Sequence, residues 1–478
     1  MSLRSQAISS VKWNAASQAV KTSLFFLTTI VLARLLDPAD FGLLGMATVF
    51  IGFIAVFNDF GLGSAVIQRR NLDQVTLSSI FWLSVIFGVV TMMITVFISP
   101  LVANFYNQAA LQPLLAVLSV SFLLTALGQV QFSMLMKRLN FKQIALIESF
   151  AGFIGGVVAI TMALLNWGVW SLAMQLIISV GTATIIYWLI STWRPNLVFD
   201  KSKMKDIINY SGSLFGFNVV NYFSRNADYL LIGKFLGPGP LGQYTLAYRI
   251  MQFPIQNITG VVNRVMFPTL SQIQENNVKI RSGFVKASQY IAFVTFPTMI
   301  GLLILSPEFI LITFGTKWIP TIPIIQILAI IGLIQSLGGM VGSIYTAKGK
   351  TDWLFYWGVF SSIIAVIFII IGLQWGIIGV AVGYAIATII LLYPNFYIPF
   401  RFINLPFKEY VYSLRYQIVD AVIMGILIFI CASIQRYFQL SNVIVLSSNI
   451  VLGIIVYFFL VIKLDRITFE DLKSALTG

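Results

Sequence analysis

The sequence predicts an all-α polytopic membrane protein, on the evidence of its composition and its long apolar stretches. Of the 478 residues, 58% are hydrophobic and 10% are charged, whereas a soluble domain is about 45–50% apolar and about 25% charged. The mean hydropathy is +0.91. The apolar stretches are unbroken, unlike the short alternating segments of a membrane β-barrel. A soluble globular protein, a disordered chain and a coiled coil are therefore excluded.

Fourteen stretches are long enough to cross the membrane, since a spanning helix needs about 20 mostly apolar residues. The connections between them are short, and the longest, around residues 194–206, is too short to hold a folded domain. The predicted helices are 11–36, 41–66, 76–98, 111–135, 144–165, 168–191, 207–236, 241–268, 284–305, 322–347, 353–373, 376–400, 416–434 and 442–463.

The distribution of Lys and Arg predicts the orientation of these helices. With a cytoplasmic N-terminus, 22 of the 30 Lys and Arg residues fall on the cytoplasmic side and 4 on the outer side, in agreement with the positive-inside rule. The net charge of +14 is then explained mainly by cytoplasmic loops, so no nucleic-acid partner is expected. Both termini are expected in the cytoplasm. The four remaining basic residues lie inside predicted helices: Lys21, Arg225, Arg249 and Arg264.

An internal repeat relates two halves of the chain. Residues 34–42 read RLLDPADFG and residues 234–242 read KFLGPGPLG, so a proline and a glycine recur at an offset of 200. Two pseudo-symmetric six-helix lobes inserted in the same direction are typical of transporters built from parallel repeats. The predicted parts are an N-lobe of helices 1–6 over 1–191, a cytoplasmic linker over 192–206, a C-lobe of helices 7–12 over 207–400, and two extra C-terminal helices with a cytoplasmic tail over 401–478.

Polar side chains recur at helical spacing on the first two helices of each half. In helix 207–236, four polar residues follow one another at intervals of three, four and three residues, which places them on one face. Helices 11–36 and 241–268 carry similar polar faces. Charged side chains cost about 2.5–3.5 kcal/mol at mid-membrane and therefore face protein interiors or watery cavities. The four residues of helix 207–236 are Asn218, Asn221, Arg225 and Asp228.

These polar faces predict a cationic central cavity between the two lobes. In the first two helices of each half, the four basic residues named above lie against two acidic ones, and arginine suits phosphate because of its planar fork. An anionic substrate is therefore expected. The candidate substrate-binding residues are Lys21, Asn221, Arg225, Arg249, Gln252 and Gln256, and the candidate coupling sites are Asp59 and Asp228.

Purely structural explanations of the same residues stay open. Arg225 and Asp228 are three positions apart, so they would also form an ion pair that only packs helices. Arg249 and Arg264 lie close enough to helix ends to extend their guanidinium groups to a membrane surface.

Residues for catalysis, metal binding or ATP hydrolysis are scarce. The chain has no histidine and a single cysteine, Cys431, so we expect no metal ion and no cofactor. The tripeptide at 349–351 resembles the end of a phosphate-binding loop, but its first glycine would fall at Ile344 and no strand precedes it. A membrane-embedded transferase would need paired carboxylates or histidines, and a non-transporting scaffold leaves the buried charges unexplained. We therefore expect a transporter or flippase rather than an enzyme.

Two strings resemble a known family. Residues 57–68 read FNDFGLGSAVIQ and residues 225–233 read RNADYLLIG. Both resemble the polysaccharide flippases of the multidrug/oligosaccharidyl-lipid/polysaccharide (MOP) exporter superfamily, in the branch that exports colanic-acid-type and teichuronic-acid-type repeat units. The resemblance covers essentially the whole chain.

The resemblance implies a substrate, a location and partners. Family members flip undecaprenyl-pyrophosphate-linked oligosaccharides from the cytoplasmic to the outer leaflet of the bacterial inner membrane, by alternating access through a V-shaped cavity. The implied partners are this lipid-linked oligosaccharide, an H⁺ or Na⁺ coupling ion, membrane lipids, and the polysaccharide polymerase and chain-length proteins. A cation-coupled multidrug extruder of the same superfamily is the alternative, but it would be expected to line its cavity with acids and aromatic rings.

The predicted topology is directly testable. Reporter fusions at Gly168 and Gly315 should give an outside signal and a fusion at Gly478 an inside signal, because Lys and Arg collect on the cytoplasmic side. Activity of an outside-specific reporter at Gly478, or its inactivity at Gly168 or Gly315, would contradict the fourteen-helix topology.

Overall fold

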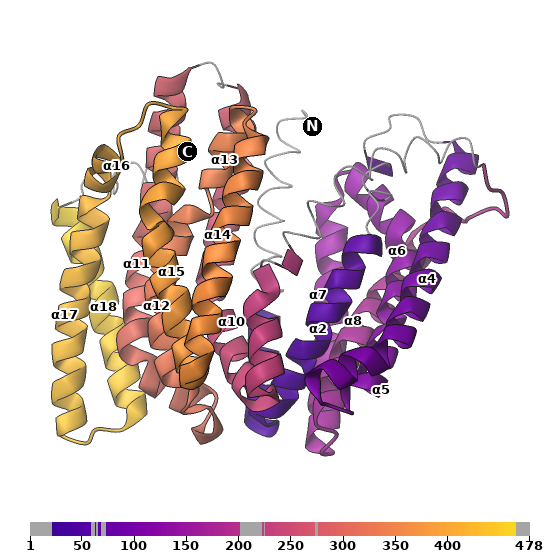
Figure 1. The fold of residues 1–478 in the computed structure, drawn as a ribbon, viewed down its shortest axis with the longest axis horizontal. Coiled ribbons are helices and arrows are strands. Elements are labelled where there is room, and N and C mark those ends of the chain that lie inside the picture. The colour runs from indigo at the N-terminus through magenta and orange to yellow at the C-terminus, as the bar shows by residue number, and fades with distance from the viewer. Residues whose placement is uncertain are drawn as a thin grey trace. The chain divides into compact units, whose positions relative to one another are not determined.

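A computed structural model describes residues 22–58, 63, 66–67, 73–200, 222–223, 225–272 and 276–464. Throughout this part of the chain the regular structure is helical, with no strand (Figure 1). The described helices include ten segments that are long and apolar enough to cross a membrane. The prediction of an all-α polytopic membrane protein is therefore confirmed. The chain forms two compact units, Met1–Gly242 and Gln243–Gly478.

The first unit contains the helices of the predicted N-lobe and the seventh predicted helix. The helices of predicted spans 11–36 and 207–236 are described only in part. The single predicted span 111–135 is two helices, because the chain bends at Ser119. The helices are Thr22–Leu35, α2 (Pro38–Asn58), α4 (Gln74–Tyr106), α5 (Leu111–Leu118), α6 (Val120–Lys137), α7 (Phe141–Leu164), α8 (Val169–Ile190) and 225–236.

The second unit contains the remaining seven predicted spans, and each corresponds to helix. The predicted span 322–347 is interrupted after Gly338, and a short helix that was not predicted, α16, lies between the last two pairs of spans. The elements are α10 (Pro238–Gln272, which begins in the first unit), α11 (Asn277–Thr313), η1 (Thr316–Trp318), α12 (Thr321–Gly338), α13 (Val341–Ala347), α14 (Thr351–Gly372), η2 (Leu373–Trp375), α15 (Gly376–Arg401), α16 (Phe407–Ser413), α17 (Arg415–Tyr437) and α18 (Asn442–Leu464).

Side-chain caps and positive-φ residues set many of the helix ends. The carboxylate of Asp73 accepts the Thr76 N–H at 3.2 Å at the start of α4, and the side chain of Asn276 accepts the Lys279 N–H at 3.0 Å before α11. These bonds satisfy backbone donors that a helix leaves free in its first turn. Gly168 and Gly315 have φ values of 54° and 92°, a region that glycine enters without strain, and each ends a connection before the next helix.

The chain that follows α8 is fixed against the start of α4. The indole N–H of Trp82 donates to the Asn196 carbonyl at 2.8 Å, and the Asn196 N–H donates to the Ser78 hydroxyl at 3.0 Å. The Asp200 N–H donates in the same way to Ser79 at 2.9 Å. The first part of the predicted linker, residues 192–200, is therefore an ordered segment that packs against the start of α4. The lobe boundary within residues 192–206 stays a prediction.

An ion pair fastens the C-terminal helices to α11. The guanidinium of Arg436 in α17 donates to both carboxylate oxygens of Glu308, at 2.7 and 2.9 Å, and to the Ile304 carbonyl at 3.0 Å. Glu308 is 3% exposed. Such a two-point pair is worth more than an exposed one, because its geometry is fixed and its acid is shielded from water. Arg436, one of the four basic residues expected on the outer side, therefore has a structural role.

The two repeat turns contact each other through matching positions. A Cβ atom on Gly42 would overlap the carbonyl oxygen of Pro238, and a Cβ atom on Gly242 would overlap the carbonyl oxygen of Pro38. The two contacts exchange under the offset of 200 that relates the repeated sequences. All four residues belong to the first unit. The start of α2 and the first turn of α10 are thus related by a local pseudo-twofold axis, with backbone packed directly on backbone.

We predict that the alanine substitutions Gly42→Ala and Gly242→Ala each lower the apparent melting temperature of the purified protein. Relief of either overlap requires backbone movement, which costs about 1–3 kcal/mol. The matched control is Gly239→Ala in the same turn, where a Cβ atom would meet nothing within 4 Å. Melting curves in detergent that are unchanged by both Gly42→Ala and Gly242→Ala would contradict the close contact.

Candidate functional site

The predicted site residues divide between the two units. Arg225 and Asp228 lie on the helix over 225–236 in the first unit, and Arg249 and two glutamines lie on α10 in the second. Each set is described within its own unit, so a shared central cavity stays a prediction. Three further candidates lie outside the described residues, namely Lys21, Asp59 and Asn221.

In the first unit, Arg225 and Asp228 lie in different environments. Arg225 is exposed, whereas Asp228 is 7% exposed. The Asp228 carboxylate accepts the backbone N–H of Tyr229 at 2.9 Å. Arg225 therefore presents a cation at the surface of this helix, and Asp228 is held inside the unit.

The beginning of this helix is anchored on α2. The Tyr222 hydroxyl donates to the Val49 carbonyl at 2.7 Å and lies against the backbone of Gly52, where a Cβ atom would overlap it. One turn later, the Tyr222 carbonyl accepts the side-chain amide of Asn226 at 2.8 Å. Because Tyr222 lies three residues before Arg225, this anchor determines where the Arg225 cation lies in the first unit.

In the second unit, Gln252 belongs to a chain of hydrogen bonds across three helices. Its amide nitrogen is 3.2 Å from the Tyr248 hydroxyl and 3.2 Å from the Gln335 side-chain oxygen. The Gln335 amide in turn donates to the Tyr384 hydroxyl at 2.7 Å. All four side chains are half-buried. These hydrogen bonds therefore link α10, α12 and α15 through polar side chains.

Gln335 and Tyr384 were not predicted as site residues. The sequence offered one sign of them, since each is a polar side chain inside an otherwise apolar span. Such residues are costly in a bilayer, and they are therefore paired or functional. The next residue, Ser336, is fully buried and is 3.1 Å from the Thr295 hydroxyl of α11. Residues 335 and 336 thus make polar contacts from α12 to three other helices.

The polar groups on α10 have the chemistry to hold a hydrated anion. Arg249, Gln252 and Gln256 follow at intervals of three and four residues, so they share one face of α10. Arg249 is half-buried and Gln256 is exposed. A guanidinium binds phosphate, while amides and phenols both donate and accept hydrogen bonds as sugar hydroxyls do. Within the described part of the chain, no group of three His, Cys, Asp or Glu residues is placed to hold a metal ion.

A comparison with protein families identifies the class of protein. A family model described as "Polysaccharide biosynthesis protein" matches residues 31–323. The chain belongs to this polysaccharide biosynthesis family. It is 31% identical over 422 residues to the lipopolysaccharide biosynthesis protein WzxC of Escherichia coli (strain K12), covering 87% of this chain and 85% of that protein. It is 30% identical over 466 residues to the teichuronic acid biosynthesis protein TuaB of Bacillus subtilis (strain 168), covering 97% and 96%.

Solved structures with the same fold are membrane transporters. The lipid II flippase MurJ in an inward closed conformation aligns with a TM-score of 0.75 and 18% identity, over 96% of this chain and 99% of that chain. An inward-facing multidrug resistance MATE transporter of the MOP superfamily aligns with a TM-score of 0.63 and 18% identity, over 80% and 94%. This chain thus has a MurJ- and MATE-like polytopic fold, and the predicted resemblance is confirmed.

Accessibility of single cysteines tests whether the candidate residues face water. In a Cys431→Ser background, we expect Lys21→Cys, Asn221→Cys and Arg225→Cys to react readily with a water-soluble thiol reagent in membranes. Asp228→Cys should react more slowly, because Asp228 is 7% exposed. Reaction is followed by the mass added to the purified protein.

The control is Phe97→Cys on α4, a side chain that is 79% exposed within an apolar span. Because lipid surrounds such a position, it should resist the water-soluble reagent and react with a membrane-permeant one. Equal protection of all four candidate positions would contradict a hydrated cavity.

Proposed function

We propose that this member of the polysaccharide biosynthesis family is a flippase. It moves undecaprenyl-pyrophosphate-linked oligosaccharide repeat units from the cytoplasmic to the outer leaflet of the bacterial inner membrane. The observation that carries the proposal is the similarity to TuaB and WzxC, which are named for teichuronic acid and lipopolysaccharide biosynthesis and align over most of this chain. The MurJ-like fold, with a TM-score of 0.75, supports it.

The properties of the substrate explain why such a protein is needed. A sugar-pyrophosphate headgroup is large, anionic and strongly hydrated, so it does not cross about 30 Å of hydrocarbon unaided. A polar path between two lobes removes this barrier, while the polyprenyl tail stays in the bilayer beside the protein. Alternating access of such a cleft to the two sides of the membrane moves the headgroup.

Positive charge and hydrogen-bonding groups suit this headgroup. Arg225 is exposed on the helix over 225–236, and Arg249 is half-buried on α10 beside the chain of hydrogen bonds through Gln252. We assign the arginines to the phosphates and the Gln252–Gln335–Tyr384 chain to the sugar hydroxyls. Lys21 and Asn221 are proposed to complete the site.

A multidrug extruder is the second candidate, because a MATE transporter shares the fold. Its TM-score of 0.63 is lower than the 0.75 of MurJ, and it aligns over 80% of this chain rather than 96%. Cationic drugs also favour cavities lined with acidic and aromatic side chains, whereas in the first two helices of each half the four intramembrane bases outnumber the two acids. Both considerations favour the flippase.

Location and partners follow from the same proposal. Both termini lie in the cytoplasm, and the polysaccharide polymerase and chain-length proteins are the functional partners. Transport is coupled to an H⁺ or Na⁺ gradient, with Asp59 and Asp228 as candidate coupling sites. The chain carries out no covalent chemistry on its substrate.

Complementation of a gene deletion tests the assignment. Deletion should accumulate a lipid-linked oligosaccharide on the cytoplasmic leaflet, and wild type should restore surface polysaccharide. Arg225→Ala at equal membrane levels should lower export about tenfold or more, because a charge-assisted contact to phosphate is lost. The matched control is Lys350→Ala, which removes an exposed cation between α13 and α14. Export is measured as surface polysaccharide per cell.

One outcome would overturn the flippase assignment, and another would overturn only the coupling to an ion gradient. Unchanged surface polysaccharide with new sensitivity to cationic dyes would identify a drug extruder. Equal flipping by purified protein in liposomes with and without an ion gradient would show a passive facilitator, and would remove the coupling role of Asp59 and Asp228.

A further inference from the structure

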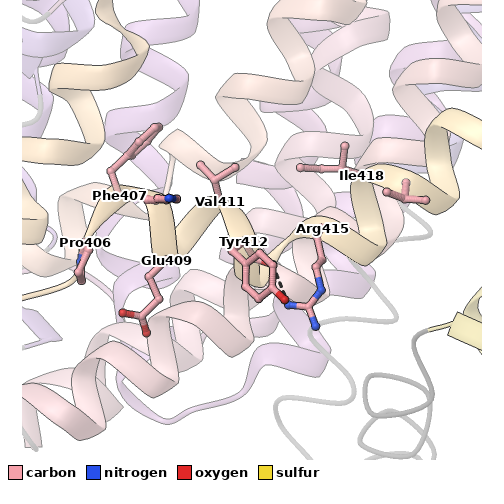
Figure 2. A pocket seen from close by; sticks show the side chains of 9 residues that line it. Pro406, Phe407, Glu409, Val411, Tyr412, Arg415 and Ile418 are labelled. Carbon is pink, nitrogen blue, oxygen red and sulfur yellow. Dashed lines mark hydrogen bonds between the residues drawn. The ribbon is translucent and has the colours of Figure 1, made fainter.

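A pocket lies at the corner between α15 and α17, away from the polar groups already described. Residues 402–414 connect the apolar segments Thr351–Arg401 and Arg415–Tyr437, so this corner lies at a membrane surface. The pocket has a volume of about 850 Å³ (Figure 2). Its lining comes from one continuous stretch of chain: Pro406, Phe407, Lys408, Glu409, Val411, Tyr412, Arg415, Ile418 and Val419.

The short helix α16 that forms one wall is firmly anchored. Tyr410 is 2% exposed, and its ring packs edge-on against Phe400 with centroids 4.9 Å apart. The Gln289 side-chain amide of α11 donates to the Ser413 carbonyl at 2.9 Å. Burial raises the pKa of the Tyr410 phenol, so this ring stays neutral and adds no charge beside the pocket. The pocket is therefore a fixed feature of the corner.

The wall of the pocket is apolar, and Lys408 and Arg415 contribute the aliphatic stems of their side chains to it, with their charged ends beside the apolar surface. Val411, Ile418 and Val419 are 42%, 36% and 45% exposed, which is unusual for aliphatic side chains unless lipid covers them. Lys408 and Arg415 also line the pocket. The one acid in the lining, Glu409, forms an ion pair with Arg281 of α11. The local charge is therefore positive.

Arg415 is held in a defined position at this pocket. Its guanidinium carbon lies 3.9 Å from the ring centre of Tyr412 and 4.3 Å from that of Tyr416. The guanidinium also donates to the Tyr412 carbonyl at 3.3 Å and to the Tyr416 hydroxyl at 3.0 Å. Figure 2 shows Tyr412 and Arg415 side by side at the pocket. Tyrosine and arginine together at a helix end are typical of anchorage at the lipid headgroup level.

We propose that this pocket binds one anionic glycerophospholipid, with its phosphate at Lys408 and Arg415 and its acyl chains against Val411, Ile418 and Val419. Two cations beside an apolar recess match a phosphate joined to hydrocarbon. Free phosphate would leave the apolar walls uncovered. The proposal does not rest on the flippase activity.

The test is lipid retention by the full-length protein, measured by native mass spectrometry after titration with dioleoylphosphatidylglycerol or dioleoylphosphatidylcholine. We expect one phosphatidylglycerol to bind about tenfold or more tightly than phosphatidylcholine, since each cation near the surface contributes several-fold in affinity. Lys408→Gln/Arg415→Gln should abolish this preference. Lys350→Gln/Lys463→Gln removes two exposed cations elsewhere on the same unit and should keep it.

A second variant tests the contribution of the apolar recess separately from that of the two cations. Val419→Trp keeps both cations and fills the recess, and it should also weaken phosphatidylglycerol binding by several-fold while the protein stays monodisperse. Equal binding of the two lipids by the wild-type protein would overturn the proposal. So would an undiminished preference for phosphatidylglycerol in Lys408→Gln/Arg415→Gln. Stronger retention of undecaprenyl phosphate than of phosphatidylglycerol would assign the pocket to a polyprenyl lipid and overturn it as well.

Discussion

A polar group within the bilayer is costly unless it finds a partner in the protein, because hydrocarbon offers none. For the backbone, helices meet this requirement locally, and the described segments are helical from Thr22 to Leu464 apart from short connections and residues 191–200 after α8. Serine and threonine hydroxyls often bond to their own helix, as Ser84 and Thr91 do, whereas longer side chains reach other helices. Gln252 reaches Gln335, and Arg436 reaches Glu308. These cross-helix bonds therefore determine which helices lie together, since apolar contacts with a neighbour and with lipid are nearly equivalent.

Close backbone contact complements these polar bonds. The turns at 34–42 and 234–242 retain a proline and a glycine at equivalent positions, and each glycine lies against the proline carbonyl of the other turn. A side chain at either position would separate the two helix ends. The repeat is thus visible in the sequence at residues whose size the packing restricts, and Leu36 and Leu236 match as well.

The sequence predicts the helices far better than it predicts the site. Apolar length predicts most of the spans, because the bilayer fixes both the length and the structure of a spanning segment. Ten described segments are long and apolar enough to cross a membrane, and α10 is not among them. The break at Ser119 was missed because apolar residues continue on both sides of it, and α16 was missed because its seven residues lie in a connection between two spans. Arg225 and Asp228 share one helical face in the sequence, yet one is exposed and the other buried. Periodicity gives the face of a helix, but burial depends on contacts with segments that are distant in the sequence, such as the hydrogen bond from Tyr222 to Val49.

The two extra C-terminal helices are fastened to α11 at both of its ends. At one end Arg436 pairs with Glu308, and at the other Gln289 donates to Ser413 while Arg281 pairs with Glu409. Gln289 and Arg281 bond to α16 and Glu308 bonds to α17, so α16 and α17 are held to α11 near both of its ends and form one body with it. The lipid pocket lies on this body and is built from a single stretch of it, 406–419. A conformational change elsewhere in the protein would therefore leave the pocket intact, and a lipid bound there would strengthen the corner rather than take part in the movement.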